Sequence, residues 1–401
     1  MRTEVSRARG AEPRGGRVTS PNQREHSVLS IGYLCLQPRR EGQASVAHVN
    51  GIVDGLRALG WRVALVEPPT SPRSIASRVC AMLWAQARYL MLLHRSEVAY
   101  IRNHFAAWPA VMVARVAGRV VVIEVNGTYD DVFVAWPGAR RFAGLINWLS
   151  RSQMRSADGL IVVTQELGEW AEAESNGRPI AVIPNAADTD YFAPAVQPES
   201  AEPYVVFVGA LAKWQGVSVM LDAVKHPEWP EGVTLRIAGD GQMANDCREA
   251  DGRDGVRYLG RVPFSDVPDL LAGAIASLSV QTPTAGRGTT GVLPVKLFEG
   301  LASGRPIIVS DLPGQGPLVE KAGCGIVIPT GDSAALARAV REISSDPDLR
   351  ERMGKLARDI AVSDHSWSER ARSTASFLVR LARKDRRGLY PSADPGNGEH
   401  P

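Results

Sequence analysis

The chain has 401 residues, of which 44% are hydrophobic, 22% charged and 6% aromatic, and this composition excludes a mainly disordered or fibrous protein. Its 46 basic and 43 acidic residues leave a net charge of only +3, so nucleic acid is not an expected partner. A chain of this length forms about two or three domains whose cores need no disulfide bonds, and we expect two.

The two ends of the chain carry no pattern of a folded element. Residues 1–27 contain several arginines but no apolar stretch, so we expect a disordered leader and no secretory signal. Residues 388–401 end in a stretch rich in Gly and Pro, which predicts a frayed tail. No apolar run approaches the roughly 20 residues of a membrane-spanning helix.

The four cysteines are scattered along the chain without a CxxC pair. This spacing predicts neither a zinc site nor a disulfide framework, and we expect reduced thiols in or near the core. The residues are Cys35, Cys80, Cys247 and Cys324.

Short β-branched runs alternate with segments of helical period from residue 28 onward, which predicts an α/β fold with parallel sheets. Strands are expected at 28–36, 61–67, 98–102, 120–125, 160–163 and 180–183, and, after a linker at 195–203, at 204–208, 234–238, 256–259, 275–280, 306–310 and 325–328. The pattern predicts two Rossmann-like doubly wound domains, 28–195 and 203–365, and a basic helix at 366–387. Ligands of such sheets bind beyond the carboxyl ends of the strands, so we expect a central cleft with a half-site on each domain.

Two polar segments follow strands of the first half. Gly42 lies in a strand-to-helix turn that leads to His48, and such a turn lets a helix N-terminus approach an anionic ligand, although an ordinary tight turn explains it equally well. Residues 124–130 begin where the fourth strand ends, which would place Asn126 and Asp130 in the cleft. The alternative is that Asn126 and Gly127 only form a turn. The segment 184–192 is interpreted as a structural cap of a short helix.

Two glycine loops follow strands of the second half. The first begins at Gly209 and would allow close backbone approach to a ligand, with Lys213 placing a positive charge against a diphosphate; the alternative is a solvated lysine. The second contains Gly239 and suits a ligand-edge loop or an ordinary tight turn.

The most informative stretch is 287–306. A loop rich in Gly and Thr opens a helix that carries Lys296 and Glu299 on one face, and Gly304 ends it. The helix start offers N–H groups to phosphate, and a carboxylate one turn further can accept hydrogen bonds from a vicinal diol. A plain surface Lys–Glu pair is the alternative.

Taken in order, the segments 184–188, 209–216, 239–241 and 294–306 resemble the GT-B-fold retaining glycosyltransferases of the GT4 type, over roughly residues 28–383. The resemblance implies a nucleotide-diphospho-sugar donor held by the second domain and a glycan or lipid-linked acceptor held by the first. It implies catalysis in the cleft with no metal and no other cofactor, and a final helix at 366–387 that crosses back onto the first domain. It also implies a cytoplasmic enzyme of cell-surface glycan synthesis, peripheral on a bacterial inner membrane.

Several donor-site residues are carried over from this family. Glu299 matches the second carboxylate of its E-x7-E motif, expected on the donor ribose, while the first carboxylate would fall at Gly291. Pro294, Lys296 and Glu299 match a P-x-K-x-x-E version of the motif. Backbone N–H groups of Gly291, Val292 and Leu293 are expected to cradle the phosphates.

The family's G-R-L…K-G loop has Ala210 and Gln215 in place of its Arg and Lys. Lys213 is therefore expected to substitute in part, with Arg287, Lys296 or Arg305 helping to neutralise the diphosphate. Gly42 and Asn126 match positions that face the donor sugar or the acceptor. The expected catalytic residues are Asn126, Lys296 and Glu299, the further donor-binding residues are Gly42, Gly209, Lys213, Gly239, Gly291, Val292 and Leu293, and the acceptor-side residues are His48, Asn126 and Asp130.

Two other functions remain open. A nucleotide-sugar epimerase of similar fold would need acid and base groups around the sugar, for which Glu124, Asp130 and His48 are candidates. A non-catalytic nucleotide-sugar binder would account for Gly291, Ala210 and Gln215. For the transferase the resemblance implies attack of the acceptor on the same face, so we expect retention of anomeric configuration. No carboxylate pair suits a double-displacement route to that outcome.

The segment 73–95 also has two interpretations. It is a helix buried against the first sheet, or a basic apolar surface that lies on an anionic membrane and reaches a lipid-linked acceptor. Polar replacement of Trp84 and Leu92 separates the two: on a membrane surface it would release the protein from liposomes without unfolding it, whereas in the core it would abolish folding.

Overall fold

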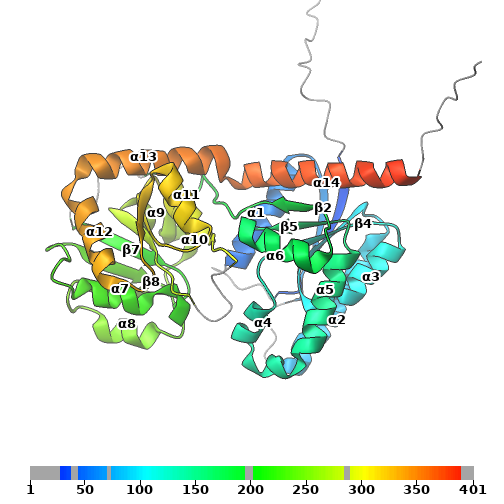
Figure 1. Cartoon of the computed structure of the whole chain (residues 1–401), viewed down its shortest axis with the longest axis horizontal. Helices are drawn as coiled ribbons and strands as arrows, with labels where there is room; N and C mark the ends of the chain where they lie inside the picture. The colour runs from blue at the N-terminus through cyan, green and yellow to red at the C-terminus, as the bar shows by residue number, and fades with distance from the viewer. Residues whose placement is uncertain (1–27, 38–43, 70–73, 195–201, 284–289, 390–401) are drawn as a thin grey trace, which may run out of the picture.

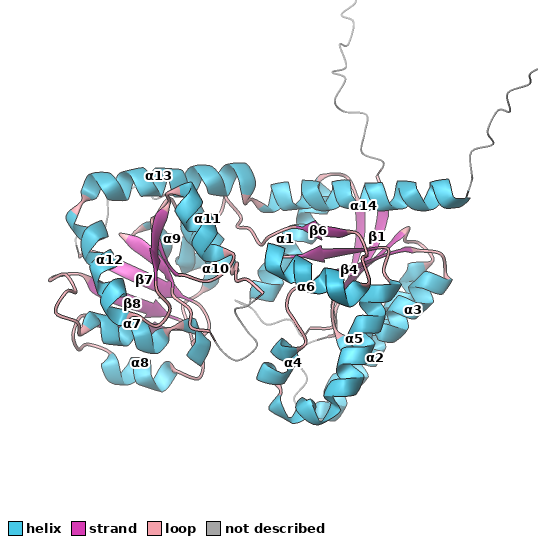
Figure 2. Ribbon diagram, viewed as in Figure 1, coloured by secondary structure: helices cyan, strands magenta, loops and turns pink. Residues whose placement is uncertain are grey.

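The computed structural model describes residues 28–37, 44–69, 74–194, 202–283 and 290–389. It contains two six-stranded parallel sheets, each with helices on both faces (Figure 1 and Figure 2). The predicted α/β fold with two doubly wound sheets is confirmed, and each expected strand is present with its ends displaced by no more than two residues. The predicted leader, 1–27, and residues 390–401 of the predicted tail lie outside the described residues.

The first sheet has the strand order β2-β1-β3-β4-β5-β6. Its central strands are runs of Val, Ile, Ala and Tyr buried on both faces, as parallel strands between two helix layers require. The strands are β1 Ser30–Leu34, β2 Arg62–Val66, β3 Val98–Arg102, β4 Val120–Val125, β5 Gly159–Val162 and β6 Ile180–Val182. The helices are α1 Ala44–Ala58, α2 Ile75–Leu93, α3 Trp108–Val116, α4 Asp130–Ala135, α5 Ala143–Ser156 and α6 Gln165–Ser175.

The second sheet has the order β12-β11-β10-β7-β8-β9, so the connections reverse direction between β7 and β10. A ligand crevice forms at such a reversal, outside the carboxyl ends of the strands. The strands are β7 Tyr204–Val208, β8 Thr234–Ala238, β9 Val256–Gly260, β10 Ala276–Ser279, β11 Ile307–Ser310 and β12 Gly325–Ile328. The helices are α7 Val217–Val224, α8 Ala244–Ala250, α9 Val267–Ala272, α10 Val295–Ala302, α11 Gln315–Ala322, α12 Ser333–Ser345 and α13 Pro347–Asp364.

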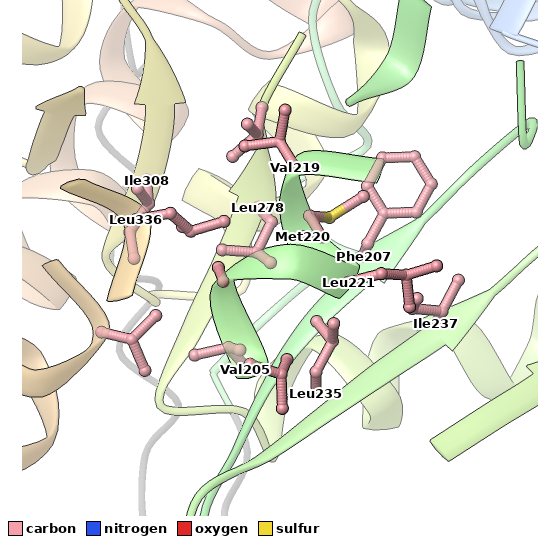
Figure 3. Packing of buried hydrophobic residues seen from close by; sticks show 14 of the residues in the cluster. Val205, Phe207, Val219, Met220, Leu221, Leu235, Ile237, Leu278, Ile308 and Leu336 are labelled. Atoms are coloured by element: carbon pink, nitrogen blue, oxygen red, sulfur yellow. The ribbon is translucent and has the colours of Figure 1, made fainter. Parts of the chain in front are cut away.

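The second domain has a hydrophobic cluster on each face of its sheet, and one of them includes α7 and α12. Figure 3 shows Phe207 and Met220 packed among the aliphatic side chains of β7, β8 and β10. Cys247 and Cys324 are buried, as is Cys35 in the first domain, whereas Cys80 is exposed on α2. All four thiols are free.

The last helix, α14 Trp367–Leu389, leaves the second domain and runs along the first (Figure 1). It packs closely on α1 because α1 has glycines at the contact: a Cβ atom on Gly51 would lie 2.2 Å from Cδ2 of Trp367, and one on Gly55 would lie 2.6 Å from Cβ of Ala371. Ala375 and Leu378 join the buried core of the first domain. The chain therefore contributes its C-terminal helix to the domain with which it starts.

Two segments connect the domains, and they are hydrogen-bonded to each other. The N–H of Ala187 donates to the carbonyl of His365 over 3.0 Å, and the N–H of Trp367 donates to the carbonyl of Ala187 over 3.1 Å. These bonds form an isolated parallel bridge between Ala187 and Ser366. The two crossings thus lie side by side.

Candidate active site

Lys296 of α10 lies at the carboxyl end of β7, where the second sheet reverses direction. Its ammonium lies 3.9 Å from the ring centroid of Phe207 and donates a hydrogen bond to Oε1 of Gln215. Gly209 directly follows β7, and a Cβ atom there would lie 3.7 Å from Nζ of Lys296. Because Gly209 has no side chain, a ligand at the carboxyl ends of the strands could approach both its backbone and the ammonium of Lys296.

Burial dominates the electrostatics of α10. It lowers the pKa of Lys296 from its ordinary value of 10.5 to about 7, against an opposing influence of Glu299. Burial likewise raises the pKa of the Glu299 carboxyl to about 7, and Lys296 opposes that rise. Each group is held in an environment that disfavours its charge, so an anionic ligand beside Lys296 would stabilise the ammonium strongly.

The two glycine loops of the second domain are packed against each other. A Cβ atom on Gly239 would lie 1.8 Å from the carbonyl oxygen of Gly209, so only glycine fits, and its φ of +152° is also unusual for other residues. Lys213 lies in the following short 3-10 helix and is exposed, whereas Gln215 of the same turn is buried and faces Lys296. Lys296, and not Lys213, therefore carries the buried positive charge at this loop.

The loop before α10 runs along the boundary between the domains. The N–H of Val292 donates to the carbonyl of Pro313 over 2.8 Å, so this group of the expected phosphate cradle is already used. The N–H groups of Gly291 and Leu293 remain as candidates. The carbonyl of Leu293 accepts a 2.8 Å bond from Nδ2 of Asn185, which makes residue 185 an interdomain contact as well as a part of the 184–192 turn.

A buried carboxylate organises the first domain. Glu124 at the end of β4 is fully buried and accepts hydrogen bonds from the hydroxyls of Tyr33 (2.9 Å) and Tyr100 (2.8 Å), from Nδ2 of Asn126 (2.6 Å) and from Arg102. Burial alone would raise the pKa of this carboxyl, but His48, Arg102 and the Asn126 bond overcome it and hold the pKa well below its usual range. Asn126 therefore turns back onto Glu124.

His48 of α1 connects this carboxylate to the second domain. Its Nε2 lies 3.0 Å from Oε1 of Glu124, without the alignment of a hydrogen bond, and its Nδ1 lies 2.7 Å from Oδ1 of Asn185. Asn185 in turn holds the carbonyl of Leu293. A continuous polar chain therefore runs from the buried core of the first domain to the loop before α10.

Other expected residues lie apart from these groups. Asp130 begins α4 with an exposed side chain and does not join the Glu124 cluster. Arg305 precedes β11 and lies near Tyr204 at the start of β7. It is therefore at the amino ends of the strands, whereas Lys296 is at the carboxyl end of β7. Gly42 and Arg287 lie outside the described residues. Among the residues that the structure describes, no three His, Cys, Asp or Glu side chains are grouped to hold a metal ion.

Sequence reasoning missed the partners that come from distant segments. Tyr33, Tyr100 and Arg102 were expected only as strand residues, and no role was expected for Thr164, which follows the strand predicted at 160–163. Thr164 is buried, caps α6 through a 3.1 Å bond from the N–H of Leu167, and donates a 2.5 Å bond to the carbonyl of Thr290 in the second domain. A Thr directly after a buried strand and before a helical pattern signals a helix cap, but not its partner across the domains.

These features agree with matches to two glycosyltransferase families. Residues 190–360 match the family described as Glycosyl transferases group 1, and residues 33–191 match Glycosyltransferase Family 4. A phosphatidyl-myo-inositol mannosyltransferase of Mycobacterium leprae is 31% identical over 392 residues, covering 88% of this chain and 96% of that protein. A glycogen synthase of Mycobacterium tuberculosis is 26% identical over 309 residues, covering 73% of this chain and 70% of that protein.

Solved structures show the same architecture. Sucrose-phosphate synthase of Thermosynechococcus elongatus superposes with a TM-score of 0.71 at 15% identity, over 89% of this chain and all of that one. HepE of Anabaena, solved in complex with UDP, gives a TM-score of 0.67 at 18% identity, over 88% of this chain. The fold is that of a two-domain GT-B glycosyltransferase. The chain belongs to the GT4-type glycosyltransferases of this fold.

Proposed function

We propose that this glycosyltransferase moves a sugar from a nucleotide-diphospho-sugar to an acceptor hydroxyl with retention of anomeric configuration, in the synthesis of a cell-surface polysaccharide or glycolipid. The observation that carries the proposal is the position of the Lys296 ammonium beside Gly209 and the Phe207 ring, at the carboxyl end of β7. Bond cleavage leaves negative charge on the departing diphosphate, and a cation fixed beforehand at that point stabilises the transition state. The mannosyltransferase and UDP-complexed relatives support this choice of donor class.

Each charged group of α10 has a role in this reaction. Lys296 would bind the diphosphate and stabilise it as the anomeric C–O bond breaks and the electron pair stays on the phosphate oxygen. Glu299, one turn further along α10, would accept hydrogen bonds from the ribose hydroxyls. The acceptor oxygen would form the new bond on the same face, with its proton passing to the departing diphosphate.

The donor class is tested by thermal unfolding with UDP, GDP, ADP, TDP and their common sugar conjugates. A ligand at about 100 times its dissociation constant adds roughly 2.7 kcal/mol to the stability of the folded state. We expect a shift selective for one base that is lost in Glu299→Ala and kept in Glu351→Ala, whose side chain is exposed on α13. A folded protein that responds to no nucleotide would overturn the proposal.

Product analysis separates the alternatives. NMR of the product's anomeric carbon is expected to show the configuration of the donor, and an inverted product would refute retention. Sugar turnover without any acceptor would indicate the epimerase instead. Donor binding with neither transfer nor slow hydrolysis would indicate the non-catalytic binder.

We also propose that the first domain meets its acceptor at an anionic membrane, from the cytoplasmic side. Helix α2 buries one face, which includes Ala85 and Tyr89, and exposes another that carries Leu83 and Trp84. The helix therefore packs one face against the core, and Leu92 is partly buried there; the exposed face is the one that we propose to lie on the membrane. None of the described helices has both the length and the apolar character needed to cross a bilayer.

The exposed apolar side chains extend from α2 to the segment 136–156. The guanidinium of Arg78 on α2 stacks on the ring of Trp136 at 5.0 Å and joins the two segments. Neither α2 nor residues 136–156 contain an acidic residue, which suits an anionic lipid surface. We call this set the basic apolar face; it comprises Ile75, Arg78, Val79, Leu83, Trp84, Arg88, Trp136, Arg140, Arg141, Phe142, Leu145 and Trp148.

Vesicle sedimentation tests this face. The double variant Leu83→Ser/Trp148→Ser is expected to lose binding to phosphatidylglycerol vesicles while keeping its unfolding midpoint, because both side chains are more than half exposed, at 60% and 54%. Leu356→Ser/Val362→Ser on α13 is the matched control, with similar exposure and no expected effect. Equal binding by all three proteins would contradict the proposed face.

A further inference from the structure

The start of α6 in the first domain meets the loop before α10 in the second. The hydroxyl of Thr164 donates a 2.5 Å hydrogen bond to the carbonyl of Thr290, and Asn185 holds the carbonyl of Leu293 three residues later. The segment between these two contacts contains Gly291. Two side chains of the first domain thus fix the backbone on both sides of this glycine.

Gly291 has no room for a side chain because Glu166 fills that space. A Cβ atom on Gly291 would lie 2.6 Å from Oε2 of Glu166 and 2.9 Å from Cβ of Thr164. The φ of Gly291 is +79°, a conformation that strains other residues. Residue 291 therefore carries no carboxylate of its own, but the carboxylate of Glu166, from the first domain, lies where a side chain on residue 291 would begin.

The carboxylate of Glu166 is incompletely satisfied. Its Oε2 is buried and has no hydrogen-bond partner among the residues that the structure describes. A buried acceptor without a partner is unfavourable, and a ligand hydroxyl would remove that penalty. Glu166 lies in the first turn of α6, and a carboxylate oxygen there can accept hydrogen bonds from ligand hydroxyls.

We propose that Glu166 is a specificity-determining residue that accepts hydrogen bonds from hydroxyls of the donor sugar, supplied across the cleft by the first domain. The inference rests on the proposed function, since it needs a nucleotide sugar bound at α10. The base and diphosphate contact the second domain alone, whereas the sugar contacts both domains. Recognition of the sugar therefore depends on both domains being in contact with the donor, whereas binding of the nucleoside diphosphate depends on the second domain alone.

Isothermal titration with paired ligands tests this division, using UDP against UDP-glucose and GDP against GDP-mannose. Glu166→Gln is expected to bind the sugar conjugate about tenfold or more weakly, because a hydrogen bond to a charged group is lost. Its affinity for the corresponding diphosphate should stay within about twofold of the wild type. Glu169→Gln, one turn away and exposed on the same helix, is the matched control and should change neither affinity.

The outcomes distinguish the inference from the proposed function. If Glu166→Gln binds both ligands equally less well, or both as well as the wild type, the inference is wrong while the donor site stands. If the wild type binds no diphosphate, the proposed function fails and the inference fails with it. Glu166→Asp, which keeps the charge but withdraws it by one methylene group, should also lose affinity for the conjugate alone; unfolding midpoints establish that each variant is folded.

Discussion

Replacement of Lys296 by Met should affect stability and ligand binding in opposite directions. Burial lowers the pKa of this ammonium from 10.5 to about 7, so between these pH values the unfolded chain binds more protons at this position than the folded one. The stability of the wild type must then rise with pH in this window, by up to about 1.4 kcal/mol per pH unit. Lys296→Met removes this contribution and leaves the other titrating groups in place.

The structure also sets the size of the effect. A shift of about 3.5 pH units disfavours the ionised side chain by roughly 4–5 kcal/mol below pH 7, so the ligand-free variant should be the more stable protein there. Glu299 acts in the opposite direction: its pKa is raised from 4.5 to about 7 while Lys296 holds it down, so Lys296→Met should raise it further and make the stability of the variant fall with pH just above 7. The same substitution should weaken diphosphate binding about 10- to 100-fold, since it removes a charge-assisted hydrogen bond.

Urea unfolding followed by tryptophan fluorescence at pH 7, 8 and 9 measures the first effect, and titration with the nucleoside diphosphate measures the second. Lys213→Met is the control, because it makes the same chemical change at an exposed position of the adjacent loop. Equal pH slopes for the wild type and Lys296→Met would refute the assignment of a buried ammonium. Loss of diphosphate binding in Lys213→Met alone would move the anion site to the exposed turn.

Two further predictions concern Glu124 and Gly291. Glu124→Gln removes the buried charge that Arg102 faces, so we expect the free energy of unfolding to fall by about 3–5 kcal/mol. Since the carboxyl has a lowered pKa, its stabilisation is present above about pH 4.5 and is lost as the pH falls further, which acid titration of both proteins would reveal. A loss of less than about 1 kcal/mol in the variant would contradict this role. Gly291 and Gly331 both have a φ near +80°, so replacing either by Ala should lower the free energy of unfolding by about 1–2 kcal/mol through backbone strain. Only a Cβ atom on Gly291 would meet neighbouring atoms, so in urea unfolding Gly291→Ala should be the more destabilised of the two. Equal losses would show that the Glu166 side chain moves away at no cost.

The sequence was sufficient for the strands and for the part of the site that is local in the chain. Runs of Val and Ile predicted the buried strands, and the three-residue spacing of Lys296 and Glu299 placed both on one face of a helix. That spacing did not predict how deeply they are buried, which depends on the packing of α10 against the second sheet and α13. The exposure of Lys213 and the burial of Gln215 depend on the geometry of a single 3-10 turn, which residue patterns do not determine.

The contacts between distant segments were beyond sequence reasoning. Glu124 was noted only as an alternative acid or base, whereas its partners Tyr33, Tyr100 and His48 come from β1, β3 and α1. The opposition of Glu166 and Gly291 depends on how the two domains are packed. A missing carboxylate is visible in the sequence, but the residue that occupies its place is visible only in the fold.

The paired crossing at Ala187 and Ser366 has a consequence for movement and for folding. Two hydrogen-bonded connecting segments resist twisting of one domain relative to the other more than a single segment would. Opening of the cleft is therefore confined to a hinge motion about one axis. The chain also closes a loop on itself, since α14 completes the core of the domain synthesised first. That domain must leave the ribosome with the surface around Gly51, Gly55 and Gly159, which α14 later covers, still exposed, and it reaches its final stability only when the last helix has been made.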